Sequence, residues 1–434
     1  MQREENQLFS LSAAFVLLAA VAVMLAAPAR AGVWAVPMDF SILGFVAVWL
    51  ACAAAGAMVV QRALPRHDLY LLPIVYLLSG WGIALIWRLA PQFAVRQTIW
   101  LAIGTAAMLG IVLLPGDLRW LRRYRYTWLF TGLALTALTL ILGVNPSGSG
   151  DRLWLGCRGL YVQPAEILKL LLVVFLASYL TDRREMLFQT RPPRVDPMPR
   201  GESLIYFLPM LVMWGFSTLI LVSQRDLGMS TLFFGVFIVM LYLASGRWEY
   251  VLAGLLLLVL AAVIGYQLFD VVRIRVQGWW NPWADPTGRS FQIVQSLIAQ
   301  AAGGVFGAGP GQGAPTLIPV AHSDFIFAAL AEEWGLLGVL AMTALLGAVV
   351  LRAMRIAAGA PSAFGQLLAG GLGALLALQT LLITGGVIKL LPLTGLTLPF
   401  VSYGGSSLVS AFCLVGVLLR LSAMSDQPAR PEAT

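Results

Sequence analysis

The stretch that decides the fold is residues 250–268, YVLAGLLLLVLAAVIGYQL, which contains no charged side chain. A helix needs about 20 mainly apolar residues to cross the hydrocarbon core of a bilayer. A stretch of this length and composition predicts a transmembrane helix. Eleven further apolar stretches repeat the pattern along the chain: 8–29, 39–61, 69–88, 95–114, 125–143, 164–181, 204–222, 229–245, 325–351, 363–388 and 400–420. We therefore expect an all-α, polytopic transmembrane bundle of about 12 spans.

The composition of the 434 residues agrees with this class. Hydrophobic residues make up 59% of the chain and charged residues 11%, whereas a typical soluble domain is about 25% charged. Too few polar groups remain to cover a soluble enzyme of this size, and the three scattered cysteines do not indicate a disulfide scaffold. The net charge of +8 indicates contact with anionic membrane lipids, with no nucleic-acid partner expected.

The arginines and lysines predict the orientation of the spans. With the N-terminus in the cytoplasm, the inside segments hold 17 arginines, and the outside segments hold 10 arginines or lysines. This excess follows the positive-inside rule. We therefore expect both termini in the cytoplasm. Two long loops, at about 144–163 and 269–324, then lie outside.

Two charged residues fall within the sixth span. Glu166 and Lys169 stand three residues apart, which places them on one face of a helix. The structural interpretation is a mutual ion pair facing the bundle, and the functional one is the wall of an internal polar cavity. The two interpretations are compatible. Asp226 and its neighbour Arg225 lie between two predicted spans, near the outer boundary of the membrane. This pattern is typical of a local turn with an ion pair.

The loop 269–324 holds several polar residues that are candidates for chemistry. Asp285 begins an Asp-Pro-Thr-Gly turn, and Gln292 and Gln295 follow it. Taken alone, such a turn is usually structural. The glycine-rich segment 303–313 is of a kind that lets backbone approach a phosphate, but no Gly-Lys-Ser/Thr follows, so it is not a P-loop.

The last third of the chain adds another group of polar residues. Asp324, close to His322, is positioned to cap the helix that follows, and Glu333 lies deeper in that span, where it needs an arginine or lysine partner. Residues 391–407 hold Ser402 and Ser406 in a Gly/Pro-rich segment near membrane depth. Such backbone is tolerated where protein buries it or where it lines a cavity.

Five motifs occur in an order that resembles the shape, elongation, division and sporulation (SEDS) family, which includes RodA, FtsW and SpoVE. In family notation they resemble QPSExxK, QPDLG, DPxGxGYQxxQS, HTDFIFAxxxEExG and LPxTGxxLPFxSYGGSS, and here they lie at 163–169, 224–228, 285–296, 322–335 and 391–407. The resemblance covers about residues 65–422. Arg225 stands where the family has proline, and Lys389 stands where it has glycine before LPxTG.

The resemblance implies a membrane glycosyltransferase domain at 65–422, preceded by two extra helices at 1–64 and followed by a cytoplasmic tail at 423–434. It implies a peptidoglycan glycosyltransferase that polymerises lipid II into β-1,4-linked glycan at the outer face of the cytoplasmic membrane, in elongation or division. The essential aspartate of the family matches Asp285. The substrate-binding candidates are Arg152, Glu166, Lys169, Asp226, Gln292, Gln295, His322, Asp324, Glu333, Ser402 and Ser406.

The partners implied are a class B penicillin-binding protein (a transpeptidase), lipid II, undecaprenyl-linked glycan and membrane lipids. No metal-ligand cluster is readable in the sequence. A divalent cation, Mg or Mn, is therefore left open as a cofactor. Two other functions also remain open: a lipid II flippase, which needs cavity charges but no outer base, and a non-catalytic scaffold of a cell-wall complex.

Overall fold

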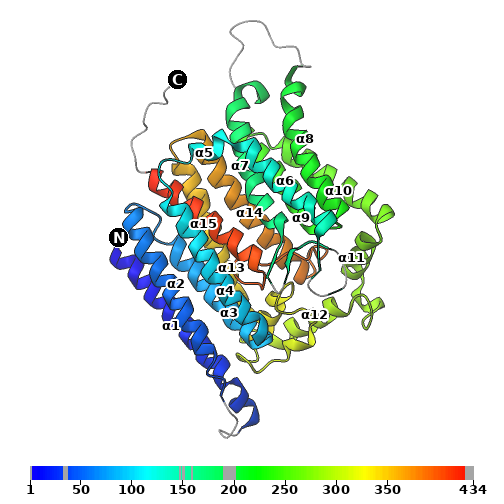
Figure 1. Ribbon diagram of the computed structural model, residues 1–434. Coiled ribbons are helices and arrows are strands. Elements are labelled where there is room, and N and C mark those ends of the chain that lie inside the picture. Colours follow the sequence, from blue (N-terminus) through cyan, green and yellow to red (C-terminus); the bar gives the residue numbers. More distant parts are fainter. Residues whose placement is uncertain are drawn as a thin grey trace. The chain divides into compact units, whose positions relative to one another are not determined.

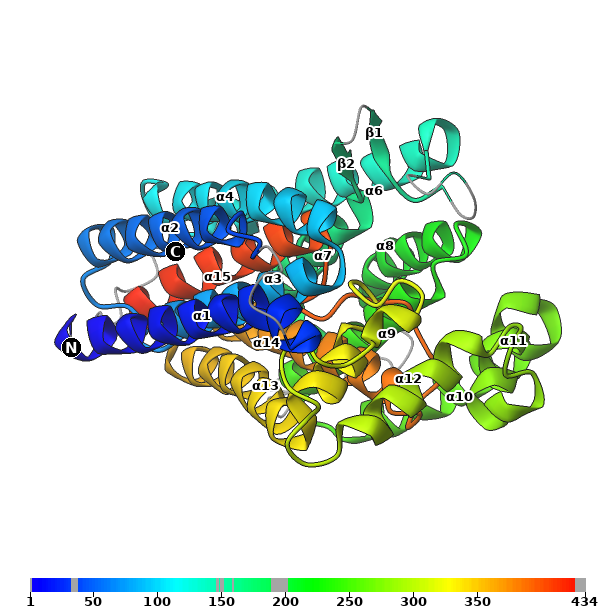
Figure 2. The same cartoon turned by 90° about the horizontal axis from the view of Figure 1, so that it is seen from below.

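A computed structural model describes residues 2–32, 38–145, 148, 152–157, 160–188 and 202–425, and it confirms an all-α fold (Figures 1 and 2). Its α-helices are α1 (Gln2–Ala31), α2 (Ile42–Ala63), α3 (Leu71–Leu89), α4 (Pro91–Leu113), α5 (Arg119–Arg123), α6 (Arg125–Leu142), α7 (Pro164–Phe188), α8 (Glu202–Ser223), α9 (Leu227–Ser245), α10 (Glu249–Leu268), α11 (Asp270–Trp280), α12 (Phe291–Gly303), α13 (Ile326–Gly359), α14 (Ala363–Val387) and α15 (Gly405–Ser425). Short 3-10 turns follow α11 and α12, η1 (Pro282–Ala284) and η2 (Pro315–Leu317). The strands β1 (Leu155–Cys157) and β2 (Leu160–Val162) pair antiparallel, with Leu155 opposite Val162.

Within the described residues, eleven helices are long and apolar enough to cross a membrane. A shorter apolar stretch, 208–223 of α8, stands at the position of the remaining predicted span. The protein is therefore a multi-pass membrane protein with about the predicted number of spans. The last predicted span, 400–420, starts too early, because α15 begins at Gly405. Phe400 has a φ of 66°, a conformation that a helix does not contain.

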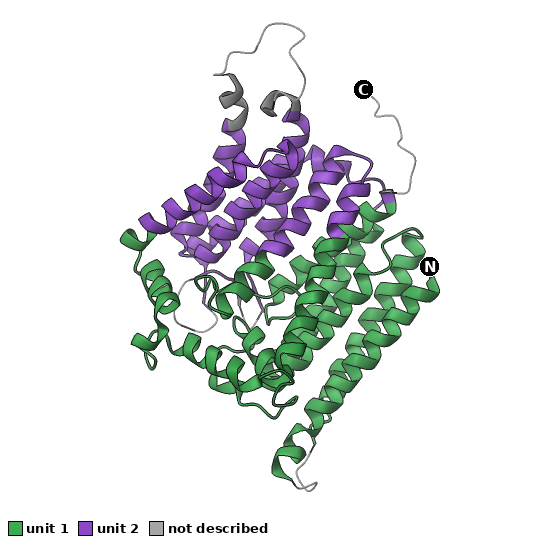
Figure 3. Cartoon of the chain, turned by 180° about the vertical axis from the view of Figure 1, so that it is seen from behind, with its two compact units in different colours: residues 1–114, 265–352, 379–423 green, residues 115–264, 353–378, 424–434 purple. Residues whose placement is uncertain are grey.

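The chain divides into two compact units, which Figure 3 colours separately. Unit 1 comprises residues 1–114, 265–352 and 379–423, and unit 2 comprises residues 115–264, 353–378 and 424–434. Each unit is therefore assembled from segments that are far apart in the sequence. The helices α1 and α2 belong to unit 1, where α1 packs along α3 and α2 packs along α4.

Unit 1 has α3 at its centre. Tyr76 of α3 is fully buried, and its hydroxyl lies 3.1 Å from the Thr105 hydroxyl on α4. Trp49 of α2 donates its indole N–H to the Tyr76 carbonyl at 2.9 Å. A buried tyrosine or tryptophan needs a partner for its polar atom. These two bonds therefore connect α3 to α2 and to α4.

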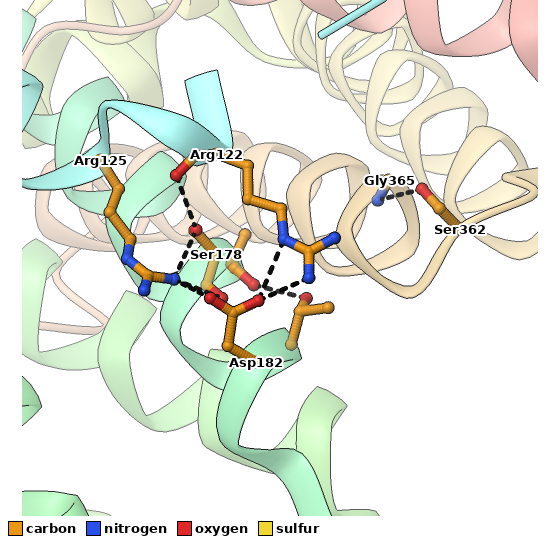
Figure 4. Close-up of polar contacts among 8 residues, drawn as sticks. Arg122, Arg125, Ser178, Asp182, Ser362 and Gly365 are labelled. Atoms are coloured by element: carbon orange, nitrogen blue, oxygen red, sulfur yellow. Dashed lines mark hydrogen bonds and ion pairs between the residues drawn. The ribbon is translucent and has the colours of Figure 1, made fainter. Parts of the chain in front are cut away.

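Unit 2 is built around α7, which packs against α6, α8 and α9. Near the end of α7, Asp182 pairs with Arg122 of α5 and Arg125 of α6, as Figure 4 shows. Arg125 also donates to the Ser178 hydroxyl, one turn earlier on α7, at 3.0 Å. The cluster thereby fastens the α5–α6 junction to α7. Figure 4 also shows Ser362 accepting a bond from the Gly365 N–H at the start of α14.

Candidate functional site

Asp285 lies between η1 and α12, on an exposed turn in unit 1. Its Oδ2 atom accepts a hydrogen bond from the Arg289 backbone N–H at 2.9 Å. The turn closes tightly on this carboxylate, since a Cβ added at Gly288 would lie 2.3 Å from Oδ1. With glycine at position 288, the aspartate side chain can occupy that space, and a larger residue would displace the carboxylate.

A cavity of about 430 Å³ lies beside this turn. Asp285 and Arg289 both line it, so an acidic and a basic residue border one space. The other lining residues come from the end of α10, from α11 and from the segment up to α12: Tyr266, Ile274, Val276, Gln277, Gly278, Trp280, Asn281, Ala284 and Ser290. Such a cavity offers an acceptor for a hydroxyl proton and a cation for an anionic group.

Helix α12 follows this turn and carries Gln292 and Gln295. Both side chains are half-buried, and neither is among the described residues that line the cavity. One face of α12 is anchored instead, because Ser296 and Gln300 donate to the carbonyl of Val387, at the end of α14, at 3.4 and 3.1 Å. These bonds tie the middle of α12 to the end of α14 within unit 1.

Helix α11 is held by backbone carbonyls of the segment after α14. Arg275 donates to the Thr394 carbonyl at 3.3 Å, and Trp279 donates to the Lys389 carbonyl at 3.1 Å. Lys389 has a φ of 62°, so the glycine that the family has here is the residue best suited to this backbone. Arg275 is not among the residues predicted from the sequence, since it lies outside the five motifs.

The segments that carry His322 and Ser402 are hydrogen-bonded to each other. The Tyr403 N–H donates to the His322 carbonyl at 2.9 Å. The Ser402 hydroxyl donates to the Ser323 carbonyl at 2.7 Å and accepts from the Leu398 N–H at 2.9 Å. Because both bonds go to backbone, Ser402 has a structural role: it joins two segments of the main chain.

The side chains of this region are mostly withdrawn from water. The His322 ring stacks on Phe93 with centroids 4.5 Å apart, and burial lowers the pKa of His322, which keeps the ring neutral at pH 7. Asp324 accepts from the Ser323 hydroxyl at 2.8 Å, and burial raises the pKa of its carboxyl group. Ser406 is half-buried at the second position of α15.

Glu332 and Glu333 face residues 303–314, which we call the glycine turn. Glu333 pairs with Arg88 of α3, as expected for a buried carboxylate in a span, with Nε and Oε1 3.1 Å apart but without a well-aligned hydrogen bond. Glu332 instead accepts from the Ala314 N–H at 2.6 Å. The glycines serve this contact: a Cβ at Gly307 would lie 2.3 Å from the Glu333 carbonyl oxygen. Gly307 thus makes room for the backbone of α13.

The remaining candidates lie in unit 2. Glu166 and Lys169 form the predicted ion pair, with both side chains buried. Asp226 caps α9 by accepting from the Met229 N–H at 3.1 Å, and Gln163 donates to its other carboxylate oxygen at 3.3 Å. Arg152 is exposed just before the strand pair. The structure therefore places four candidates in unit 2 and the other eight in unit 1.

No group of three or more His, Cys, Asp or Glu side chains that could hold a metal ion occurs among the described residues. Asp285 is the one carboxylate among the described residues that line the cavity. This lining does not fit a cation held by the protein alone, so the mechanism proposed for the site uses only side chains of the chain.

Comparison with known proteins gives concordant results. Residues 68–427 match the FtsW/RodA/SpoVE family, described as cell cycle protein. The chain is 38% identical over 407 residues to the peptidoglycan glycosyltransferase RodA of Mycobacterium tuberculosis, covering 91% of this chain and 86% of that protein. A chain of a solved peptidoglycan synthase complex aligns with a TM-score of 0.68 and 27% identity, over 83% of this chain and 99% of that one. The crystal structure of the rod shape determining protein RodA of Thermus thermophilus aligns with a TM-score of 0.60 and 26% identity, over 83% and 98%.

Proposed function

The chain belongs to the FtsW/RodA/SpoVE family, and from this premise we propose that it polymerises lipid II as a peptidoglycan glycosyltransferase. The observation that carries the proposal is the cavity lined by both Asp285 and Arg289. Relatives that match most of the chain are named for this glycosyltransferase activity. The reaction joins a sugar 4-hydroxyl to an anomeric carbon and releases a polyprenyl pyrophosphate.

Asp285 is the general base of this proposal. An ionised carboxylate has about four acceptor sites, and one described bond, from the Arg289 N–H, occupies part of that capacity. The remaining capacity suits a substrate hydroxyl whose proton transfers to the carboxylate as the glycosidic bond forms. A single displacement inverts the anomeric centre, so an α-linked donor gives a β-1,4-linked product.

Arg289 is the cation best placed in unit 1 to stabilise the leaving pyrophosphate, because it lines the same cavity as the base. Positioned positive charge at a developing negative charge lowers the barrier to reaction. Arg152 and Lys169 belong to unit 2 and stay candidates for contacts with other parts of the substrate. The other predicted substrate-binding residues stay candidates within their own units. They are Glu166 and Asp226 in unit 2, and Gln292, Gln295, His322, Asp324, Glu333, Ser402 and Ser406 in unit 1.

We assign the Asp285 loop to the outer face of the cytoplasmic membrane and both termini to the cytoplasm. The positive-inside count supports this orientation. The partner we propose is a class B penicillin-binding transpeptidase, which would crosslink the nascent strand. A structural relative that comes from a peptidoglycan synthase complex supports this assignment.

The test is lipid II polymerisation by the purified protein with its cognate transpeptidase, beside Asp285→Asn and Asp285→Ala. We expect muramidase-sensitive polymer from the wild type, and a rate lower by about 10²–10⁴-fold in both variants, because general-base catalysis contributes about that factor. Reactions with EDTA and with added Mg²⁺ or Mn²⁺ determine whether a cation assists.

Arg247→Gln is the control, since this exposed arginine of unit 2 is outside the proposed site. Equal polymer from the wild type and the folded Asp285 variants would exclude Asp285 as the base. No polymer from any of them, with the partner bound, would favour a flippase or a scaffold instead.

A further inference from the structure

Helices α1 and α2 precede the family match, which begins at residue 68. Both ends of α1 are nevertheless tied to other parts of unit 1. Near its start, Glu5 is fully buried and pairs with His67 at 3.1 Å. Near its end, Arg30 donates to the carbonyl of Gly313 in the glycine turn. A segment outside the family match therefore contacts a turn inside it.

The glycine turn completes a break in α13. Gly335 has φ 65° and ψ −166°, so the helix is interrupted there. The carbonyls of Glu332 and Glu333 accept hydrogen bonds from the N–H groups of Ala308 and Gly309 at 2.9 and 3.0 Å. Because buried carbonyls within a membrane need partners, the turn and the break stabilise each other.

Helix α1 covers the other side of this turn. A Cβ added at Gly311 would lie 2.2 Å from the Ala26 Cβ, so helix and turn touch at that point. One turn of helix later, Arg30 binds the Gly313 carbonyl. Arg88 of α3 donates to the same carbonyl at 3.1 Å and to the Gly311 carbonyl at 3.3 Å. The turn is thus held between α1 and α13.

The glycine turn is one helix away from the base. It begins at Gly303, the last residue of α12. Helix α12 begins immediately after the Asp285 turn, where the Phe291 N–H donates to the Gly288 carbonyl at 3.2 Å. A shift of the turn therefore moves the end of a rigid helix whose other end supports the Asp285 turn. A displacement of about 1 Å at a reacting group is enough to slow catalysis by about 10²-fold.

We propose that α1 is a positioning element for the active site. Ala26 and Arg30 hold the glycine turn on the α13 break, and this fixes α12 and the Asp285 turn behind it. Arg30 is a positioning residue and does not contact substrate. The expected effect on the reaction rate rests on the proposed function. The contact of α1 with the glycine turn does not depend on that function.

The test uses two pairs of matched variants in the full-length protein. Arg30→Gln removes the bond to Gly313, and Arg62→Gln is its control on the exposed face of α2. Ala26→Leu wedges the turn away from α1, and Ala29→Leu adds the same volume at an exposed position one turn away. Hydrogen–deuterium exchange measures the amides of residues 304–314, and lipid II polymerisation with the transpeptidase gives kcat and KM.

We expect faster exchange at 304–314 in Arg30→Gln and Ala26→Leu, with exchange in α3 and α4 unchanged. We expect kcat to fall by about 10-fold or more while KM stays within about twofold, since the substrate contacts remain. Arg30→Lys keeps a cationic donor and is expected to restore part of both readouts.

Unchanged exchange at 304–314 in both variants overturns the proposal, and so does faster exchange throughout unit 1, which indicates general loss of structure. Faster exchange at the turn with wild-type kcat refutes the positioning role. If the wild type itself makes no polymer while exchange responds as expected, the proposed function fails and the hold of α1 on the turn stands.

Discussion

Glu166 in unit 2 and Asp285 in unit 1 are both motif carboxylates, but they have opposite surroundings. Glu166 is 3% exposed on α7 and pairs with Lys169. Asp285 is exposed on a turn, and its described bond is to a backbone N–H. A buried carboxylate needs its cation in order to remain charged, whereas an exposed one keeps acceptor capacity for a substrate. The first arrangement pairs two buried charges within one helix, and the second is available for proton transfer.

The largest change in stability is expected from breaking the buried pair. Lys169→Met leaves the Glu166 carboxylate in the protein interior without its lysine, which should lower the free energy of unfolding by about 3–5 kcal/mol. Asp285→Asn, on an exposed turn, should change it by no more than about 0.5 kcal/mol. Thermal unfolding in detergent compares the two. The double variant Glu166→Gln/Lys169→Met should recover part of the lost stability. If Lys169→Met and Asp285→Asn lower Tm equally, the proposed difference between the buried and the exposed carboxylate is wrong.

A smaller effect, on rate rather than stability, is expected at Gly288. The alanine Cβ of Gly288→Ala would meet the Asp285 carboxylate at 2.3 Å and push it out of place. We expect kcat for lipid II polymerisation to fall by about 10- to 100-fold. Gly110→Ala is the matched control, since nothing lies within 4 Å of its added Cβ. If the two variants have the same kcat, the orientation of Asp285 by its turn is irrelevant to catalysis.

The smallest effect, a pH-dependent change in stability, is expected at a third carboxylate, Glu5. Its partner is His67, which gains or loses a proton near neutral pH. Burial opposes charge on His67, but the hydrogen bonds to Glu5 and to the Leu64 carbonyl raise its pKa above the ordinary value of 6.5; Asp68 acts in the same direction. The folded state therefore binds this proton more tightly than the unfolded state. The added stability is fully present below about pH 6.5 and is lost as the pH rises through the folded-state pKa.

We therefore expect the wild type to exceed His67→Gln in Tm by more at about pH 5.5 than at about pH 8.5. Comparing the variant with the wild type at each pH removes the contribution of other titrating groups. A difference in Tm that does not change with pH would show that the Glu5–His67 contact does not depend on protonation.

Much of the bundle could be predicted from sequence because long apolar runs and i,i+3 charge pairs are local signals. The Glu166–Lys169 pair and the need of Glu333 for a cation both follow from such signals. Helices α11 and α12 were missed within the loop 269–324. They are 11 and 13 residues long, too short for a span, and Arg273, Arg275 and Gly278 weaken the apolar pattern of α11.

The contacts of the glycine-rich segment could not be predicted from the sequence. Its glycines suggested an approach to phosphate, but Gly303 and Gly307 make room for the backbone of α13 at Ala331 and Glu333, which come 28 and 26 residues later. That contact depends on a helix break at Gly335, and no local pattern indicates which backbone will approach which. Asp285 itself was found through its motif, since an Asp-Pro-Thr-Gly turn alone is usually structural.

The contact between the glycine turn and α13 has a consequence for how the protein can evolve. At Gly303, Gly307 and Gly335 the contact consists of main-chain atoms, and any side chain there would meet backbone at 1.9–2.3 Å. Main-chain atoms are the same in every amino acid, so substitutions cannot adjust this joint in small steps. We therefore expect gradual change only at its rim, at side chains such as Ala26 and Arg30. Substitutions at the rim can therefore change the stability of this backbone contact without changing the contact itself.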